Sequence, residues 1–146
     1  MRETDPRPES EGVSKRSKGY MWDYQGWTSN AETLPYRGTP AGRGYSTLGD
    51  LLLFARALQT NALLPMAELA EATFPQNHHQ DYGDGFQTIG VGAVRYYGHA
   101  GGAPGMSADF RIYPELDVVI IALSNLDPPV ASKLADFYAD RMPESP

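Results

Sequence analysis

Nine consecutive residues, Tyr97-Gly-His-Ala-Gly-Gly-Ala-Pro-Gly105, combine four glycines, one proline and one histidine. They lie between two segments that are predicted as β-strands. Glycine serves in a strand where the backbone must approach another group closely or adopt a positive φ angle. Four glycines beside a histidine are consistent with a strand edge that is kept bare so that a ligand can lie along it. On this stretch alone a plain glycine-rich connection is favoured, since turns also select glycine, and the surrounding chain changes that balance.

The segments on both sides of this stretch predict an antiparallel sheet. Residues 86–92 and 93–98 predict a hairpin whose turn lies near residues 90–92. Residues 106–113 alternate between apolar and polar side chains, which is typical of a strand with one buried face. The continuous apolar run over residues 118–123 predicts a central strand that is covered on both faces.

Two helices are predicted before the sheet. The first spans residues 47–59, where Ser46 or Thr47 fits the cap and Asp50 fits the acid of a capping box. The second begins at Pro65, because proline suits the first turn of a helix, and ends before Pro75.

A last helix is predicted after Asp127, which we assign as its cap, with two prolines in the first turn. Its spacing predicts an apolar stripe formed by Val130, Leu134, Phe137 and Tyr138.

An aromatic row begins at residue 20, where Tyr20, Trp22 and Tyr24 recur at every second position and Trp27 follows. This spacing predicts a half-buried strand. A stacking platform for bases or sugars is the alternative, but the acidic balance of the chain favours packing.

The composition excludes several classes of protein. The 146 residues carry 12 lysines and arginines against 18 aspartates and glutamates, a formal net charge of −6, which argues against a nucleic-acid-binding surface. No apolar run approaches the roughly 18 residues of a membrane span. The chain has no cysteine, so disulfides, thiolate metal sites and a cysteine nucleophile are excluded.

The first 18 residues are polar and charged, with few apolar side chains. Such a segment buries too little surface to offset its ordering entropy, so residues 1–18 are predicted as a disordered tail and residues 19–146 as the domain. The segment lacks the features of a signal peptide. The chain as it stands is expected in the cytoplasm, while a periplasmic or exported parent protein stays open.

Four blocks, in order, resemble the carboxy-terminal part of the serine β-lactamase-like family, which includes class C β-lactamases, penicillin-binding DD-peptidases and related esterases. Residues 40–51 resemble its Pro-Ala-Gly-Gly-x-Tyr-Ser-Thr-x-x-Asp-Leu segment, and residues 82–86 resemble its Tyr-Gly-x-Gly-Phe entry to a strand. Residues 98–105 resemble its Gly-His-x-Gly-Gly-x-x-Gly element, and residues 118–125 its apolar strand ending in Ser-Asn or Thr-Asn. The resemblance covers about residues 20–140.

This resemblance implies part of a β-lactamase or DD-peptidase-like α+β fold. The chain would supply an antiparallel sheet meander, a C-terminal helix packed on it and two helices of the helical lobe. The intact parent would form an acyl-enzyme with a β-lactam, a D-Ala-D-Ala peptide or a simple ester, and water would release the product.

The resemblance also implies roles for residues of the glycine-rich stretch. His99 would stand where the family often has lysine and would direct a proton donor at the pocket. The backbone N–H of Gly102 would form one half of an oxyanion hole. Ala100 and Gly101 would be small so that substrate can add along the strand. Apart from the resemblance, Arg43 stands between Gly42 and Gly44 and is a candidate to face a substrate carboxylate, although an ordinary surface arginine is favoured.

The chain departs from the family at the nucleophile. None of Lys15, Lys18 and Lys133 has a serine three positions earlier, and no tyrosine has an asparagine two positions on. The sequence therefore lacks Ser-x-x-Lys and Tyr-x-Asn, of which residues 28–30 are the nearest approach, and it also lacks Gly-x-Ser-x-Gly. We expect the chain alone to be inactive. It is interpreted as a truncated or split hydrolase, or else as a non-catalytic binding or assembly domain.

No cofactor or metal is predicted. His78 and His79 lie near Asp81 and Asp84, but adjacent histidines point in different directions, so a solvated loop is favoured over a metal site. The sheet lacks the family's amino-terminal strands and should end in an unpaired strand. We therefore expect a homodimer or a complex with the missing amino-terminal half, and a small amide or ester as the substrate of the intact parent.

Overall fold

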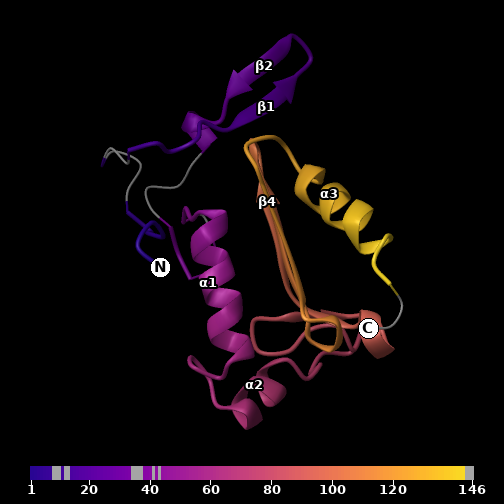
Figure 1. Cartoon of the computed structure of the whole chain (residues 1–146). Coiled ribbons are helices and arrows are strands. Elements are labelled where there is room, and N and C mark those ends of the chain that lie inside the picture. Colours follow the sequence, from indigo (N-terminus) through magenta and orange to yellow (C-terminus); the bar gives the residue numbers. More distant parts are fainter. Residues whose placement is uncertain (8–10, 12–13, 34–37, 41, 43, 144–146) are drawn as a thin grey trace.

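The computed structural model describes residues 1–7, 11, 14–33, 38–40, 42 and 44–143. Its main body is an antiparallel sheet with the strand order β3 (Gln87–Ile89), β4 (Tyr96–Ala103), β5 (Met106–Tyr113), β6 (Val118–Ser124). Helices α1 (Leu48–Gln59) and α3 (Val130–Ala139) lie on opposite sides of the sheet, and α2 (Met66–Ala72) lies at one end (Figure 1). The predicted α+β meander with a C-terminal helix and two further helices is confirmed.

The glycine-rich stretch forms β4 and the turn that follows it. Tyr97 pairs with Ile112 and Ala103 pairs with Met106, so the strand continues through all the glycines up to the turn. Gly105 turns the chain with a φ of 70°, a conformation that suits glycine. The glycine-rich stretch is therefore part of a strand, and the interpretation as a plain glycine-rich connection is wrong.

Both faces of β5 are buried, whereas one buried face is predicted. Ile112 packs with Ala55 and Leu58 of α1 in the core on one face of the sheet. On the other face, Asp109 and Arg111 are also buried beneath α3. This is possible because Arg111 bonds Asp109 through two hydrogen bonds of 2.8 and 2.9 Å and thereby neutralises its charge.

The stripe predicted for α3 points away from the sheet. Its inner face consists of Ala131 and Ala135, which are 1% and 0% exposed. The larger apolar residues are about half exposed and comprise Val130, Leu134, Phe137 and Tyr138. Small residues let the helix approach the sheet closely, and a wide apolar face is left without a partner in the described part of the chain.

The apolar strand β6 is an edge strand here, which corrects the prediction of a central strand. Helices contact it from both sides, as expected, but Leu123 remains 43% exposed. Within the described residues, its outer side carries no strand, and a single parallel bridge joins Tyr20 to Leu126 just beyond its end.

The aromatic row forms a separate hairpin, β1 (Tyr20–Asp23) and β2 (Gly26–Ser29), at one end of the molecule (Figure 1). The predicted strand is confirmed as β1, but its half burial is wrong, because Trp22 is 59% exposed and Tyr24, in the turn, is fully exposed. The rings of Trp22 and Trp27 contact each other, with centroids 5.3 Å apart, and the hairpin is joined to the main body through hydrogen bonds from its backbone amides to residues 125 and 127.

Two carboxylates assigned to helix caps serve other parts of the chain. Thr47 caps α1 as predicted, but the Asp50 carboxylate accepts hydrogen bonds from the amides of Arg2 and Glu3 and from the Thr4 hydroxyl. Asp127 accepts from the amides of Trp22 and Gly105, at 2.8 Å each, and α3 begins without a side-chain cap. Both assignments as caps are therefore wrong.

The segment predicted as a tail thus contacts α1 through residues 2–4, and the domain boundary at residue 18 stays a prediction. In the described part of the chain, no helix combines the length and apolar character needed to cross a bilayer.

Candidate functional site beside the glycine-rich strand

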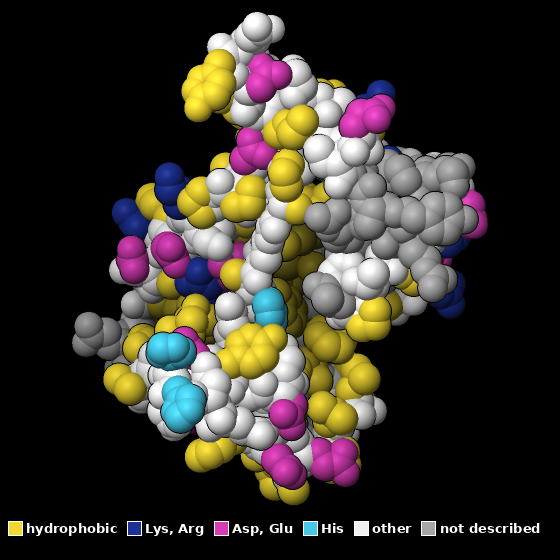
Figure 2. All heavy atoms as spheres, turned by 180° about the vertical axis from the view of Figure 1, so that it is seen from behind, with side chains coloured by type: hydrophobic (Ala, Val, Ile, Leu, Met, Phe, Trp, Pro, Cys, Tyr) yellow, Lys and Arg dark blue, Asp and Glu magenta, His cyan; other side chains and the backbone are white. Residues whose placement is uncertain are grey.

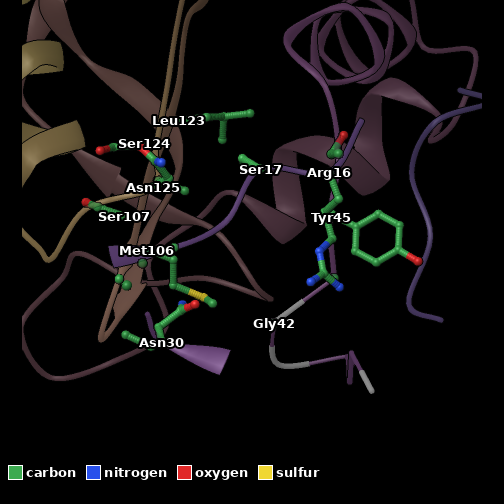
Figure 3. Close-up of a pocket in the computed structure, with 18 of the residues that line it drawn as sticks. Arg16, Ser17, Asn30, Gly42, Tyr45, Met106, Ser107, Leu123, Ser124 and Asn125 are labelled. Atoms are coloured by element: carbon green, nitrogen blue, oxygen red, sulfur yellow. The ribbon is translucent and has the colours of Figure 1, made fainter. Parts of the chain in front are cut away.

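A cavity of about 780 Å³ opens on the sheet face that carries α1, beside the glycine-rich half of β4. We call it the β4 cavity. Met106 and Leu123 line its sheet side, and Arg16 and Tyr45 line the opposite side (Figure 3). In Figure 2 this face of the molecule has a hollow near its middle, and hydrophobic side chains lie inside that hollow. The cavity is large enough for a small-molecule ligand.

The charged side chains among the described residues that line the β4 cavity are all basic. They are Arg7, Arg16 and Lys18, with His99 as a further potential cation, and no described carboxylate lines it. Arg7 is paired with Asp5 at 2.7 Å, and both side chains are partly exposed to water. In a chain of net charge −6, this arrangement favours an anionic group in the cavity.

His99 lies on β4 with both ring nitrogens engaged. Its Nδ1 is 2.6 Å from the carbonyl oxygen of Ala100, and its Nε2 is 2.9 Å from the hydroxyl oxygen of Tyr82. A ring held in this way reaches a ligand only by exchanging one of these contacts. The proton donor expected from His99 is therefore coupled to Tyr82.

The Gly102 N–H is directed at the outer edge of β4. Residues of an antiparallel strand direct their backbone groups alternately to one neighbour and then to the other. Ala100 donates its N–H at 3.0 Å to the side chain of Gln87, on the β3 side, so Gly102, two residues on, faces the same way. Strand β3 pairs with β4 only as far as Gly98. No described strand therefore pairs with the outer edge of β4 at Gly102.

The glycines of the site differ in what surrounds them. A side chain at Gly102 would collide with the ring of Pro128, so packing requires glycine there. At Gly101 a Cβ would meet no described atom within 4 Å. Packing within the described chain therefore gives no reason for glycine at position 101. Arg43, the remaining predicted substrate-binding residue, lies outside the described residues.

No nucleophile-base pair is found among the described residues. The hydrogen bonds of their serine side chains involve no histidine or lysine: Ser107, for example, accepts from the Ala131 amide at 3.2 Å. Asn30, in the segment nearest to Tyr-x-Asn, is buried and donates at 3.0 Å to the Pro104 carbonyl, which is a structural contact. Acyl transfer needs a nucleophile from elsewhere.

The residues described also gather no group of three or more His, Asp or Glu side chains that could hold a metal ion. His78 and His79 lie exposed on their loop.

Sequence reasoning missed Tyr82 and Gln87, which both reach His99 or its neighbour. Tyr82 belongs to a block that resembles the family, but that block gives no role for its side chain. An isolated bridge between the two residues aligns their side chains toward β4, and this contact depends on the tertiary fold.

Comparison with solved structures identifies the fold. A penicillin-binding protein from Bacillus halodurans matches with a TM-score of 0.86 at 24% identity, over 95% of this chain and 44% of that one. A D-stereospecific amidohydrolase from Streptomyces sp. matches with a TM-score of 0.67 at 24% identity, over 87% of this chain and 40% of that one. Both have the serine β-lactamase fold, and so does this chain.

The family model described as Beta-lactamase matches residues 1–142, and the chain belongs to this family. The match includes the first 18 residues. A search of curated proteins found no match. The chain spans less than half the length of the solved structures that it matches.

Proposed function

We propose that the chain is the carboxy-terminal part of a β-lactamase-family serine hydrolase and forms half of its acyl-transfer site. The observation that carries this proposal is the bare edge of β4 at the β4 cavity, where the Gly102 N–H faces outward and Gly101 has open space beside it. The Ser-x-x-Lys half of the site lies outside these 146 residues, and the test below supplies it as a second polypeptide.

In this site the serine hydroxyl gives its proton to the lysine of Ser-x-x-Lys, and its oxygen attacks the carbonyl carbon of an amide or ester. The Gly102 N–H and the N–H of the serine stabilise the negative oxygen of the tetrahedral intermediate. The pair formed by His99 and Tyr82 supplies a proton near the leaving group, and water then hydrolyses the acyl-enzyme. The basic side chains of the β4 cavity favour a substrate with a carboxylate.

The missing half also accounts for the unpartnered surfaces of the chain. The outer side of β6 carries no strand among the described residues, and the outer face of α3 exposes large apolar side chains, among them Leu134 and Phe137. Unpaired backbone groups beside apolar surface are a template for another chain. We therefore propose a stable complex with the missing half or, in its absence, a homodimer.

The test is to express the chain alone and together with a polypeptide that carries Ser-x-x-Lys and Tyr-x-Asn and is encoded next to it. The pair should hydrolyse a chromogenic β-lactam or a p-nitrophenyl ester, and mass spectrometry should find the acyl group on the partner's serine. The chain alone should match the buffer control. Saturable turnover with an acyl adduct on the chain alone would contradict the proposal.

Within the active pair, His99→Ala should lower kcat/KM by about 10- to 1,000-fold, the range for one acid or electrostatic donor. His79→Ala is the matched control, because His79 lies exposed on a loop, and it should leave the rate unchanged. Equal rates for the two variants would remove His99 from the mechanism.

A non-catalytic binding domain is the second candidate, and the lack of a nucleophile among the described residues favours it. Such a domain should retain a β-lactam or an acyl-D-Ala-D-Ala peptide at equilibrium without turnover, also when the second polypeptide is present. Calorimetric titration of the chain and of the pair separates the two functions.

A further inference from the structure

We propose that Tyr82 is the positioning residue of His99. Its hydroxyl binds Nε2 and thereby holds the ring in the orientation in which Nδ1 meets the Ala100 carbonyl. Without this contact the ring is free to turn away from that carbonyl, and the reason for a proton on Nδ1 is lost. The catalytic consequence rests on the proposed function, whereas the tautomer itself is a property of this chain alone.

The tautomer follows from the contacts of the two ring nitrogens. Nδ1 lies 2.6 Å from the Ala100 carbonyl oxygen, which only accepts hydrogen bonds, so Nδ1 must be the donor. In the neutral ring Nε2 is then an acceptor, and the Tyr82 hydroxyl, 2.9 Å away, donates to it. The two rings meet edge-on, with centroids 5.6 Å apart and planes at 90°, which holds the imidazole from the side as well.

The backbone of Tyr82 is fixed well enough to direct its side chain. Its carbonyl accepts from the Gln76 amide at 2.8 Å, and its amide donates at 3.1 Å to the side chain of Asn77. It also forms an isolated bridge with Gln87. The Gln87 side chain accepts from the Ala100 amide at 3.0 Å, so the two bridged residues hold His99 and its neighbour at the same point of β4.

This arrangement determines how the ring carries a proton. A proton taken up by the neutral ring must add to Nε2, because Nδ1 already has one. The charged ring then donates from Nε2 to the Tyr82 oxygen, and the hydroxyl hydrogen turns outward to a ligand or water. Tyr82 stays neutral throughout, and release of the proton from Nε2 restores the first arrangement.

The test is side-chain nitrogen NMR of the complete chain in alkaline solution, where long-range ¹H–¹⁵N spectra distinguish protonated from unprotonated ring nitrogens. In the wild-type chain His99 should show a protonated Nδ1, while His78 and His79 on their exposed loop show the Nε2–H form that free histidine favours. Tyr82→Phe should return His99 to the pattern of the loop histidines. Tyr24→Phe is the matched control, since Tyr24 is fully exposed, and it should change nothing.

A wild-type His99 with its proton on Nε2 would overturn the proposal, and so would a tautomer that survives Tyr82→Phe. Tyr82→Phe must keep the far-UV circular dichroism spectrum of the wild-type chain, because an unfolded chain gives the free-histidine pattern at all three rings for another reason. A variant that unfolds would contradict a role limited to positioning.

Activity of the two-polypeptide complex gives a second readout. Tyr82→Phe should lower kcat/KM by about 2- to 10-fold, the factor for one hydrogen bond, and should cost nothing further when His99 is already alanine. Additive losses would contradict coupling of the two side chains. A complex without activity would end the proposed function but leave the NMR result standing, so the two failures are distinguishable.

Discussion

Asp109→Asn should destabilise the chain strongly, although it changes a single atom. The carboxylate is 2% exposed and receives two hydrogen bonds from Arg111, whose side chain is itself buried between β5 and α3. Burial alone would lower the pKa of Arg111, but hydrogen bonds to Asp109 and Asp136 carry it well above its ordinary value, so the guanidinium stays charged. The asparagine amide would direct N–H groups at this buried cation.

Breaking a buried ion pair from one side costs about 3–5 kcal/mol. Asp136 still contacts Arg111 at 2.8 Å, and Arg111 still lies over the ring of Tyr96, so part of the charge remains compensated. We therefore expect a loss of about 2–4 kcal/mol in the free energy of unfolding. This is a large fraction of the roughly 5–15 kcal/mol that stabilises an ordinary domain.

Urea unfolding followed by far-UV circular dichroism measures this loss, at a concentration where light scattering has fixed the association state. Asp136→Asn is the control, because that carboxylate is 60% exposed and an exposed pair contributes at most about 1 kcal/mol. Equal losses for the two variants would refute the argument that burial decides the cost.

The remaining predictions concern acid stability, the helix surface and the site. The pKa of Asp50 lies below its ordinary value, because hydrogen bonds from residues 2–4 outweigh the opposing effect of burial, so its stabilisation is present above about pH 4. It is lost as the pH falls through the lowered pKa, and an acid unfolding curve unchanged by Asp50→Asn would contradict this. Leu134→Lys should change the stability of the monomer by less than about 0.5 kcal/mol but weaken association in light scattering, whereas Ala135→Leu should cost about 1–3 kcal/mol by overpacking. Gly101→Ala has open space and should leave the melting temperature within about 2 °C, while Gly102→Ala should lower both melting temperature and activity; the reverse order would refute the packing argument.

The sequence predicts the local elements well, because their signals are local. Thr47 caps α1, Pro65 precedes α2, and alternation and glycine placement mark the strands of the meander. The resemblance of four short blocks also leads to the correct family. All of these features depend on neighbours within a few residues.

The contacts between distant residues could not be predicted in the same way. Periodicity finds an apolar stripe on α3, but it does not tell that Ala131 and Ala135 pack on the sheet while the larger side chains face outward. The larger side chains dominate the pattern, although they are about half exposed in the described chain. Asp50 likewise has the spacing of a capping box, yet its carboxylate accepts hydrogen bonds from amides that lie 47 and 48 residues away in the sequence.

Asp127 couples the tryptophan fluorescence of the chain to the turn after the glycine-rich strand. The chain has two tryptophans, Trp22 and Trp27, and both are on the β1–β2 hairpin, with their rings 5.3 Å apart. The hairpin is tied through the Asp127 carboxylate to the amide of Gly105, in the turn that ends the glycine-rich strand. Intrinsic fluorescence therefore follows the release of the hairpin rather than melting of the core. A fluorescence change at constant circular dichroism would register an event at the β4 edge, such as docking of the second polypeptide, without any added label.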